Sequence, residues 1–261
     1  MTEATPQLAW PKLAWKGVTK RFEDRTVLDG LDLSVAPGKS LVIIGGSGQG
    51  KSVTIKTALG LMRPDAGRIE LDGKDTVNIS EHARRKLFSR VGVLFQGAAL
   101  FDSLTIWENV AFRLINADGV PRKEAKDRAI EALEQVRLAP AVADRFPSEL
   151  SGGMQKRAGL ARAVVAQPEI LFFDEPTTGL DPITAAAINE LISDQVRRLG
   201  STAVSITHDL ASAQTIGDEI AMLHDGKIIW RGPAAELRMT DNAYVSQFVK
   251  GRAEGPIAHA V

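Results

Sequence analysis

The sequence predicts an α/β domain built around a phosphate-binding loop. Residues 45–52 read Gly-Gly-Ser-Gly-Gln-Gly-Lys-Ser, which matches the pattern G-x-x-x-x-G-K-[ST]. An apolar run precedes this loop and a helical stretch follows it, so the order is strand, glycine loop, helix. Three later apolar runs also deliver polar residues; they cover 91–96, 170–173 and 203–207. Parallel sheets place ligand groups at the carboxyl ends of their strands, which is where these polar residues stand.

The glycine loop can hold a triphosphate. Its glycines allow consecutive backbone N–H groups to turn toward an anion, and the following helix adds its positive dipole end. Lys51 is expected to reach the β- and γ-phosphates, and the Ser52 hydroxyl to bind the Mg²⁺ that bridges them. The alternative is a flexible glycine turn. The nucleotide-binding residues expected here are Gly45, Gly46, Ser47, Gly48, Gln49, Gly50, Lys51, Ser52 and Val53.

Composition excludes several classes of function. The 261 residues can bury a large core, and 32 basic residues balance 32 acidic ones, so no overall charge favours a nucleic-acid partner. Without cysteine, disulfides, thiol catalysis and cysteine-based zinc sites are excluded. The first residues resemble no signal peptide and no apolar run approaches ~18 residues, so we expect neither export nor a membrane span.

The first elements are two strands after a loose arm at residues 1–11. The segments 13–22 and 26–35 alternate apolar and polar residues. Phe22 ends the first strand; a core position explains it simply, although an aromatic ring there could stack on an adenine. Beyond the glycine loop, 67–71 predicts another strand and 80–90 a polar helix.

A helical insert follows the strand that ends at Gln96. Residues 97–166 carry helical apolar spacing, and a glutamine at a strand's carboxyl end is placed to contact a ligand. Within the insert, Ser151, Gly152 and Gly153 precede a helix and form a second possible anion nest, a turn whose N–H groups converge. Taken alone, this stretch is better explained by Ser151 capping the helix.

The strand at 170–173 delivers two adjacent carboxylates. Asp174 is expected to bind Mg²⁺, and Glu175 to accept a proton from the water that attacks the γ-phosphate or to orient that water. A simple turn before Pro176 is the structural alternative. Asp181 then caps a helix that begins with Pro182. His208, after the strand 203–207, can donate a hydrogen bond to a γ-phosphate.

The remaining segments are a hairpin, a short helix and a tail. Residues 219–223 and 227–230 flank Asp225-Gly226 and predict the hairpin. The folded unit is expected over 12–240 and the tail over 241–261. Apolar residues at 244–249 can line one helix face that needs a surface to pack on. Residues 251–261 are expected either to fray or to dock on a neighbouring subunit.

The order of these motifs resembles the ATP-binding cassettes of ABC transporters along nearly the whole chain. The resemblance implies a P-loop NTPase cassette with a mixed sheet core, a helical subdomain at about 97–166 and a small antiparallel β-subdomain. It also implies that ATP is the substrate with Mg²⁺. Phe22 would stack on adenine, Gln96 would bind the nucleotide and metal, and Glu175, His208 and Lys51 would be catalytic. Two copies would pair head to tail, so that Ser151, Gly152, Gly153 and Asp181 serve the partner's ATP. Met154 and Gly179 depart from the usual glutamine and Ala or Ser.

A narrower similarity is to the ATPase of Mla-type, MCE-associated phospholipid transporters. It rests on the ranges 94–105, 108–112, 151–154, 181–184 and 247–256. It implies a peripheral position at the cytoplasmic face of the bacterial inner membrane. The partners would be a permease, a periplasmic MCE protein and a small STAS-domain protein. The permease would contact 97–110, whose apolar residues Leu100, Phe101, Leu104 and Trp107 look exposed. Another ABC importer or exporter, a soluble ABC ATPase and a non-catalytic ATP-gated scaffold are the alternatives.

Overall fold

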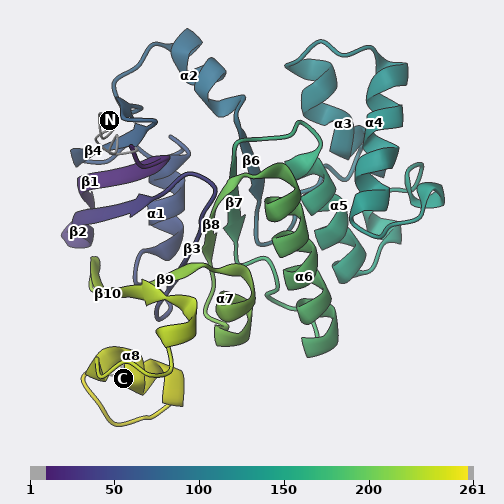
Figure 1. Cartoon of the computed structure of the whole chain (residues 1–261). Helices are drawn as coiled ribbons and strands as arrows, with labels where there is room; N and C mark the ends of the chain where they lie inside the picture. Colours follow the sequence, from purple (N-terminus) through teal and green to yellow (C-terminus); the bar gives the residue numbers. More distant parts are fainter. Residues whose placement is uncertain (1–9, 258–261) are drawn as a thin grey trace, which may run out of the picture.

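The computed structural model describes residues 10–257, which form two sheets and the helices packed on them (Figure 1). The six-stranded sheet has the order β10-β9-β3-β8-β7-β6, and the four-stranded sheet has the order β2-β1-β4-β5. The strands are β1 (Leu13–Phe22), β2 (Arg25–Val35), β3 (Ser40–Ile44), β4 (Ala66–Leu71), β5 (Lys74–Asp75), β6 (Val91–Leu94), β7 (Ile170–Asp174), β8 (Thr202–Ile206), β9 (Glu219–His224) and β10 (Lys227–Pro233). The helices are α1 (Lys51–Ala58), α2 (Glu81–Phe88), α3 (Ile106–Asn116), α4 (Arg122–Gln135), α5 (Gly152–Val164), α6 (Pro182–Leu199), α7 (Leu210–Ile216) and α8 (Ala243–Lys250), with 3₁₀ turns at Pro140–Val142, Pro147–Glu149 and Ala234–Glu236.

The six-stranded sheet is mixed, as predicted. Five strands run parallel and only β10 pairs antiparallel, with β9. Every residue of β3, β7 and β8 is buried, because helices and the second sheet cover both faces. The carboxyl ends of these three strands therefore lie together at one edge, where their connections carry the predicted polar residues.

The two faces of β3 belong to two different apolar clusters. Val42 and Ile44 pack in the larger cluster with residues of α3 to α6, whereas Leu41 and Ile43 pack in a second cluster with β1, β2, β4 and α1. The four-stranded sheet is antiparallel, and the Trp15 indole joins it to α1 by donating to the Thr54 carbonyl at 3.1 Å. The β-subdomain thus supports the helix that follows the glycine loop.

Helices α3, α4 and α5 stand together beside the six-stranded sheet (Figure 1). They lie within the predicted insert, and Leu133, Val136 and Leu138 bury the expected apolar face. Trp107, expected to look outward, is 8% exposed, since the helix turns it inward. Phe101 is 46% exposed, as expected. Within residues 10–257, no helix is both long and apolar enough to cross a membrane.

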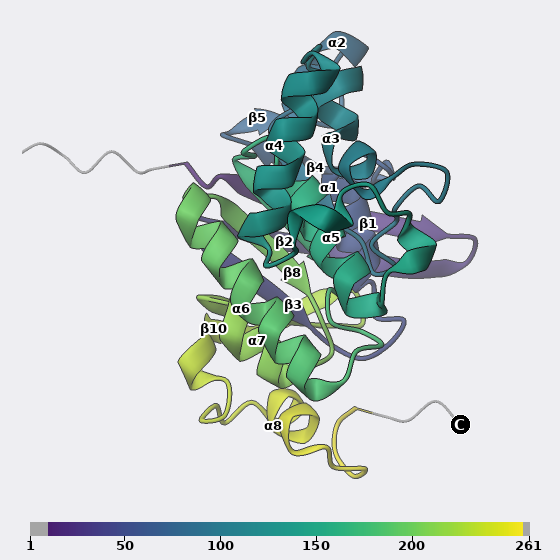
Figure 2. The same ribbon diagram turned by 90° about the vertical axis from the view of Figure 1, so that its right-hand side faces the viewer.

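The C-terminal segment folds back on α8 up to residue 257. Both views place α8 at the end of the molecule opposite α2 (Figure 1, Figure 2). The buried Gln247 amide accepts from the Ile257 N–H at 2.7 Å and donates to the carbonyls of Arg252 and Ile257. The composition of this part predicts that it frays, but in the structure residues 252–257 fold back on α8. Most of the predicted arm, 1–9, and the last residues, 258–261, lie outside the described residues.

Candidate functional site

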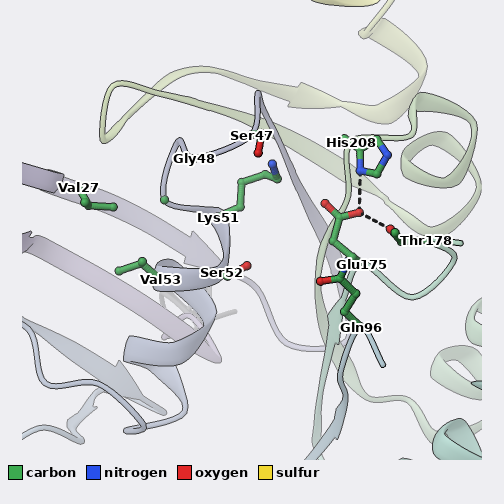
Figure 3. Close-up of a pocket in the computed structure, with 11 residues that line it drawn as sticks. Val27, Ser47, Gly48, Lys51, Ser52, Val53, Gln96, Glu175, Thr178 and His208 are labelled. Carbon is green, nitrogen blue, oxygen red and sulfur yellow. Dashed lines mark hydrogen bonds and ion pairs between the residues drawn. The ribbon is translucent and has the colours of Figure 1, made fainter. Parts of the chain in front are cut away.

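A cavity of about 510 Å³ lies at the carboxyl edge of the six-stranded sheet. Figure 3 shows Lys51 and Ser52 on one side of it and Gln96, Glu175 and His208 on the other. The lining residues are Val27, Ser47, Gly48, Gly50, Lys51, Ser52, Val53, Gln96, Glu175, Thr178 and His208. The structure therefore brings together most of the residues predicted around the triphosphate, although they come from four separate parts of the chain.

The glycine loop leaves no room for side chains at two positions. A Cβ on Gly45 would lie 2.3 Å from the Leu223 carbonyl oxygen, and one on Gly50 would lie 2.9 Å from that of Val27. Both glycines also have positive φ, +150° and +99°. The Gln49 side chain accepts from the Asp225 N–H at 2.6 Å, which fixes the loop against the β9–β10 turn.

The Lys51 ammonium is curled back into the loop. Its Nζ donates to the carbonyls of Gly45 and Gly46, each at 2.9 Å. Burial lowers the pKa of Lys51, and the charges of Glu175 and Asp174 oppose this shift. The Lys51 ammonium is therefore a cation close to the carboxylates of Asp174 and Glu175.

Asp174 ends β7 in a setting that suits a metal ion. Burial and the Glu175 charge raise the pKa of Asp174, while Lys56, the Ser52 hydroxyl and Lys156 act in the opposite direction. Its buried Oδ1 has no hydrogen-bond partner among the described residues. In residues 10–257 no three His, Cys, Asp or Glu side chains cluster around a metal position. A carboxylate with an unpartnered oxygen beside the Ser52 hydroxyl fits Mg²⁺, which binds few protein groups together with phosphates.

Glu175 is held at both its backbone and its side chain. Its φ is +48°, in the left-handed region that non-glycine residues rarely adopt, and its N–H donates to the Ile206 carbonyl at 3.0 Å. Its Oε2 lies 2.8 Å from His208 Nδ1 and accepts from the Thr178 hydroxyl at 3.0 Å (Figure 3). Two neighbours therefore orient a carboxylate at the cavity wall, the geometry that a general base requires.

Comparison with known families agrees with this arrangement. The model of the family described as "ABC transporter" matches residues 28–178, more than half of the chain. The chain belongs to the ABC transporter family. It is an ATP-binding cassette, and the predicted fold class is confirmed.

Two curated relatives cover almost all of this cassette. It is 39% identical over 242 residues to the "Probable ribonucleotide transport ATP-binding protein mkl" of Mycobacterium leprae, covering 93% of this chain and 70% of that protein. It is 37% identical over 242 residues to the "Intermembrane phospholipid transport system ATP-binding protein MlaF" of Haemophilus influenzae, covering 93% of this chain and 91% of that protein. The predicted similarity to an Mla-type ATPase is confirmed.

Solved cassettes share the fold. The "Dimeric structure of a post-hydrolysis state of the ATP-binding cassette MJ0796 bound to ADP and Pi" superposes with a TM-score of 0.78 at 31% identity, over 85% of this chain and 98% of that one. This likeness and the family match show that the chain is an ATPase, as predicted.

The predicted second nest lies at a different place from the cavity. Ser151 caps α5 by accepting from the Met154 N–H at 3.4 Å, and Asp181 caps α6 by accepting from the N–H groups of Ile183 and Thr184. A Cβ on Gly153 would lie 2.8 Å from the Thr184 side chain, so the two helix starts are neighbours. Within the described chain, none of Ser151, Gly152, Gly153 and Asp181 lines the cavity.

The predicted adenine-stacking residue also lies outside the cavity lining. The Phe22 ring is 42% exposed at the end of β1, with Lys20 Nζ 5.5 Å from its centroid. Its hairpin reaches the glycine loop through Arg25, which donates to the Gly48 carbonyl at 3.2 Å. The ring is therefore available to a ligand, and it is not the core residue that simple packing would suggest.

Sequence patterns missed three residues around this site. Val27 and Thr178 line the cavity, and Lys156 lies behind it with its amino group on the main chain of Gln96 and Glu175. Thr178, three residues after Glu175 in a turn, could have been suggested by its spacing. For Lys156 the sequence contains no signal, since nothing local predicts the burial of a lysine.

Proposed function

We propose that this chain is the ATPase subunit of a transporter that moves phospholipids between the inner and outer membranes. The observation that carries the proposal is the 37% identity to MlaF over 91% of that protein, whose name states intermembrane phospholipid transport. In this proposal the subunit lies at the cytoplasmic face of a bacterial inner membrane, bound to a permease. A periplasmic MCE protein and a small STAS-domain protein complete the assembly.

In the proposed mechanism the glycine loop holds the triphosphate. Backbone N–H groups of residues 45–50 and the start of α1 bind the phosphates, and Lys51 moves from the loop carbonyls to the β- and γ-phosphates. Ser52, Asp174 and Gln96 would hold Mg²⁺, which when bound would neutralise negative charge on the phosphates. Phe22 stacks on the adenine from the adjoining hairpin.

Glu175 takes the proton of the attacking water. Its orientation by His208 and Thr178 supports this role, because a base must be aligned before proton transfer. His208 has a second role, donation of a hydrogen bond to the γ-phosphate. The presence of an aligned Glu175 and His208 argues against the alternative that the chain is a non-catalytic, ATP-gated scaffold.

A second copy of the chain completes each ATP site. The nest at Ser151, Gly152 and Gly153 lies at the start of the thirteen-residue helix α5, outside the cavity, where N–H groups and the positive end of the helix dipole can attract an anion. Head-to-tail pairing places this nest and Asp181 against the partner's nucleotide. The similar MJ0796 cassette, bound to ADP and Pi, is dimeric, which supports such pairing.

A different transported substrate is the second candidate. The relative from Mycobacterium leprae is named for ribonucleotide transport and is 39% identical. Because transported molecules contact the membrane subunit, cassette identity alone discriminates weakly between these substrates. A soluble ABC ATPase is the third candidate and predicts no permease partner.

Purification of the complex from detergent-solubilised membranes tests the proposal. We expect the tagged chain to carry with it a permease, an MCE protein and bound phospholipid. Phe101→Asp should weaken this co-purification without loss of ATP affinity, since it would bring a carboxylate into the proposed apolar permease contact. The Phe101 ring now packs against Phe112 of the same chain, with centroids 4.7 Å apart. Phe146→Asp, at a comparable 43% exposure, is the control. A permease recovered without an MCE protein, or no membrane partner, would contradict the proposal.

A further inference from the structure

Lys156 is a buried cation behind the catalytic edge of the sheet. It lies on α5, five residues after Ser151, and is only 6% exposed. An ammonium group loses its hydration when it is buried, so it is stable there only with hydrogen-bond acceptors and negative charge around it. Burial lowers the pKa of Lys156, and the charges of Asp174 and Glu175 oppose this shift.

The acceptors of Lys156 are the main-chain carbonyls of two catalytic segments. Its Nζ donates to the Gln96 carbonyl and, at 3.5 Å, to the Glu175 carbonyl. One side chain thus ties α5 to the connection after β6 and to the connection after β7. Arg162, also on α5, donates to the carbonyls of Ala98 and Ala99, so it holds the loop that follows Gln96.

Lys156 completes the support of the Glu175 backbone. That residue has a left-handed φ of +48°, a conformation that persists only where the surroundings fix it. Its N–H donates to the Ile206 carbonyl of β8 at 3.0 Å, and its C=O accepts a longer hydrogen bond of 3.5 Å from Lys156. Without the lysine, the carbonyls of Gln96 and Glu175 lose a charged donor, and the Glu175 backbone loses one of its restraints.

We propose that Lys156 is a positioning residue for ATP hydrolysis, which holds the main chain of Gln96 and Glu175 in register with the helix that carries Ser151. A shift of α5 moves this ammonium, so the nest offered to the partner subunit and the base of the chain's own site move together. The inference rests on the proposed role of Glu175. It adds a residue that touches neither nucleotide nor water and acts through those that do.

Steady-state ATPase kinetics of the full chain test this role. Lys156→Met retains an unbranched side chain that ends at Cε and lacks the charged donor, and we expect kcat to fall about 10- to 100-fold, the effect of a small misplacement of a catalytic group. The Kd for a non-hydrolysable ATP analogue should stay within about two-fold, because Lys156 does not line the cavity. Lys156→Arg should restore part of kcat. The exposed Lys86→Met on α2 is the matched control.

A double variant separates positioning from a structural role. On a Glu175→Gln background, Lys156→Met should lower the residual rate little further, since residues that act through one group are not additive. A folded Lys156→Met protein with wild-type kcat, or equal losses in kcat and analogue affinity, overturns the proposal. If Lys156→Met does not fold, Lys156→Gln, whose amide is too short to reach both carbonyls, must show the same fall in kcat. Retained hydrolysis in Glu175→Gln alone would instead contradict the base assignment on which the proposal rests.

Discussion

At the scale of single residues, one peptide unit separates two carboxylates with different environments. Asp174 belongs to β7, is buried, and has a raised pKa from burial and from the neighbouring charge. Glu175 leaves the strand with positive φ, which directs its side chain to His208 and Thr178. Adjacent groups can therefore take different tasks, metal binding for the first and proton transfer for the second.

These different tasks predict that substitutions of Glu175 and Lys51 affect different steps, hydrolysis for Glu175 and ATP binding for Lys51. Glu175→Gln retains the shape of the side chain but cannot accept a proton, so kcat should fall by ~10²–10⁴ while ATP affinity stays similar. Lys51→Ala should instead raise the Kd for ATP, because it removes the cation from the phosphates. Radiometric ATPase assays and nucleotide titrations measure both effects, with the exposed Glu134→Gln as control. A kcat of Glu175→Gln within a few-fold of the wild-type value would rule out Glu175 as the general base.

Sequence patterns predicted the residues whose roles follow from local order. Lys51, Asp174 and Glu175 were found because a glycine loop or an apolar strand delivers them. Lys156 was missed because its role depends on two carbonyls that lie 60 and 19 residues away in the sequence. Only the packing of α5 against the sheet brings these groups together.

At the scale of elements, a cluster of four charged side chains joins the ends of several strands. Lys12 Nζ lies 3.1 Å from Asp72 and 2.5 Å from Glu169, and Arg90 contacts the same two carboxylates at 2.5 and 2.6 Å. These residues flank β1, β4, β6 and β7, so the cluster connects the two sheets. Hydrogen bonds from Arg90 and Lys12 lower the pKa of Glu169 to about 2.

The low pKa of Glu169 predicts acid-sensitive stability. An unfolded glutamate titrates near ~4.3, so the ionised cluster stabilises the fold above that pH and loses this contribution as pH falls toward 2. Because Glu169 is half exposed and solvent screens its charge, Glu169→Gln should lower the unfolding free energy by only roughly 0.5–1 kcal/mol at pH 7. Urea unfolding of both proteins from pH 7 to 3.5 should show that the difference in unfolding free energy between wild type and Glu169→Gln becomes smaller below about pH 4.3. A difference in unfolding free energy that does not change with pH would contradict this role of Glu169. An equal loss of stability in the exposed control Glu131→Gln would contradict it as well.

Most strands of the core and most helices were predictable, and two short elements were not. The strands of the core and α3 to α6 follow from apolar runs, caps and prolines. The two-residue β5 and the seven-residue α7 were not predicted, because such short segments carry too little periodicity. The fold-back of 252–257 includes hydrogen bonds to one buried glutamine, Gln247, whereas the sequence left open whether this end frays or docks on a neighbouring subunit.

At the scale of the whole molecule, the cavity and the predicted second nest lie apart on one chain. The cavity holds the glycine loop, Gln96, Glu175 and His208, while Ser151 and Asp181 cap neighbouring helices outside it. If ATP hydrolysis needs both sets, each reaction requires two copies, and a dimer like that of the similar MJ0796 cassette would supply them. This is the central claim of the proposed mechanism.

Covalently linked dimers with two lesions test that claim most directly. With Lys51→Ala in one copy and Ser151→Arg in the other, head-to-tail pairing places both lesions in one site and leaves the second intact. With both lesions in the same copy, each site carries one. The account predicts that the first dimer retains about half of the wild-type ATPase rate if the sites act independently, and that the second is nearly inactive. Equal rates for the two arrangements would contradict a site shared between copies.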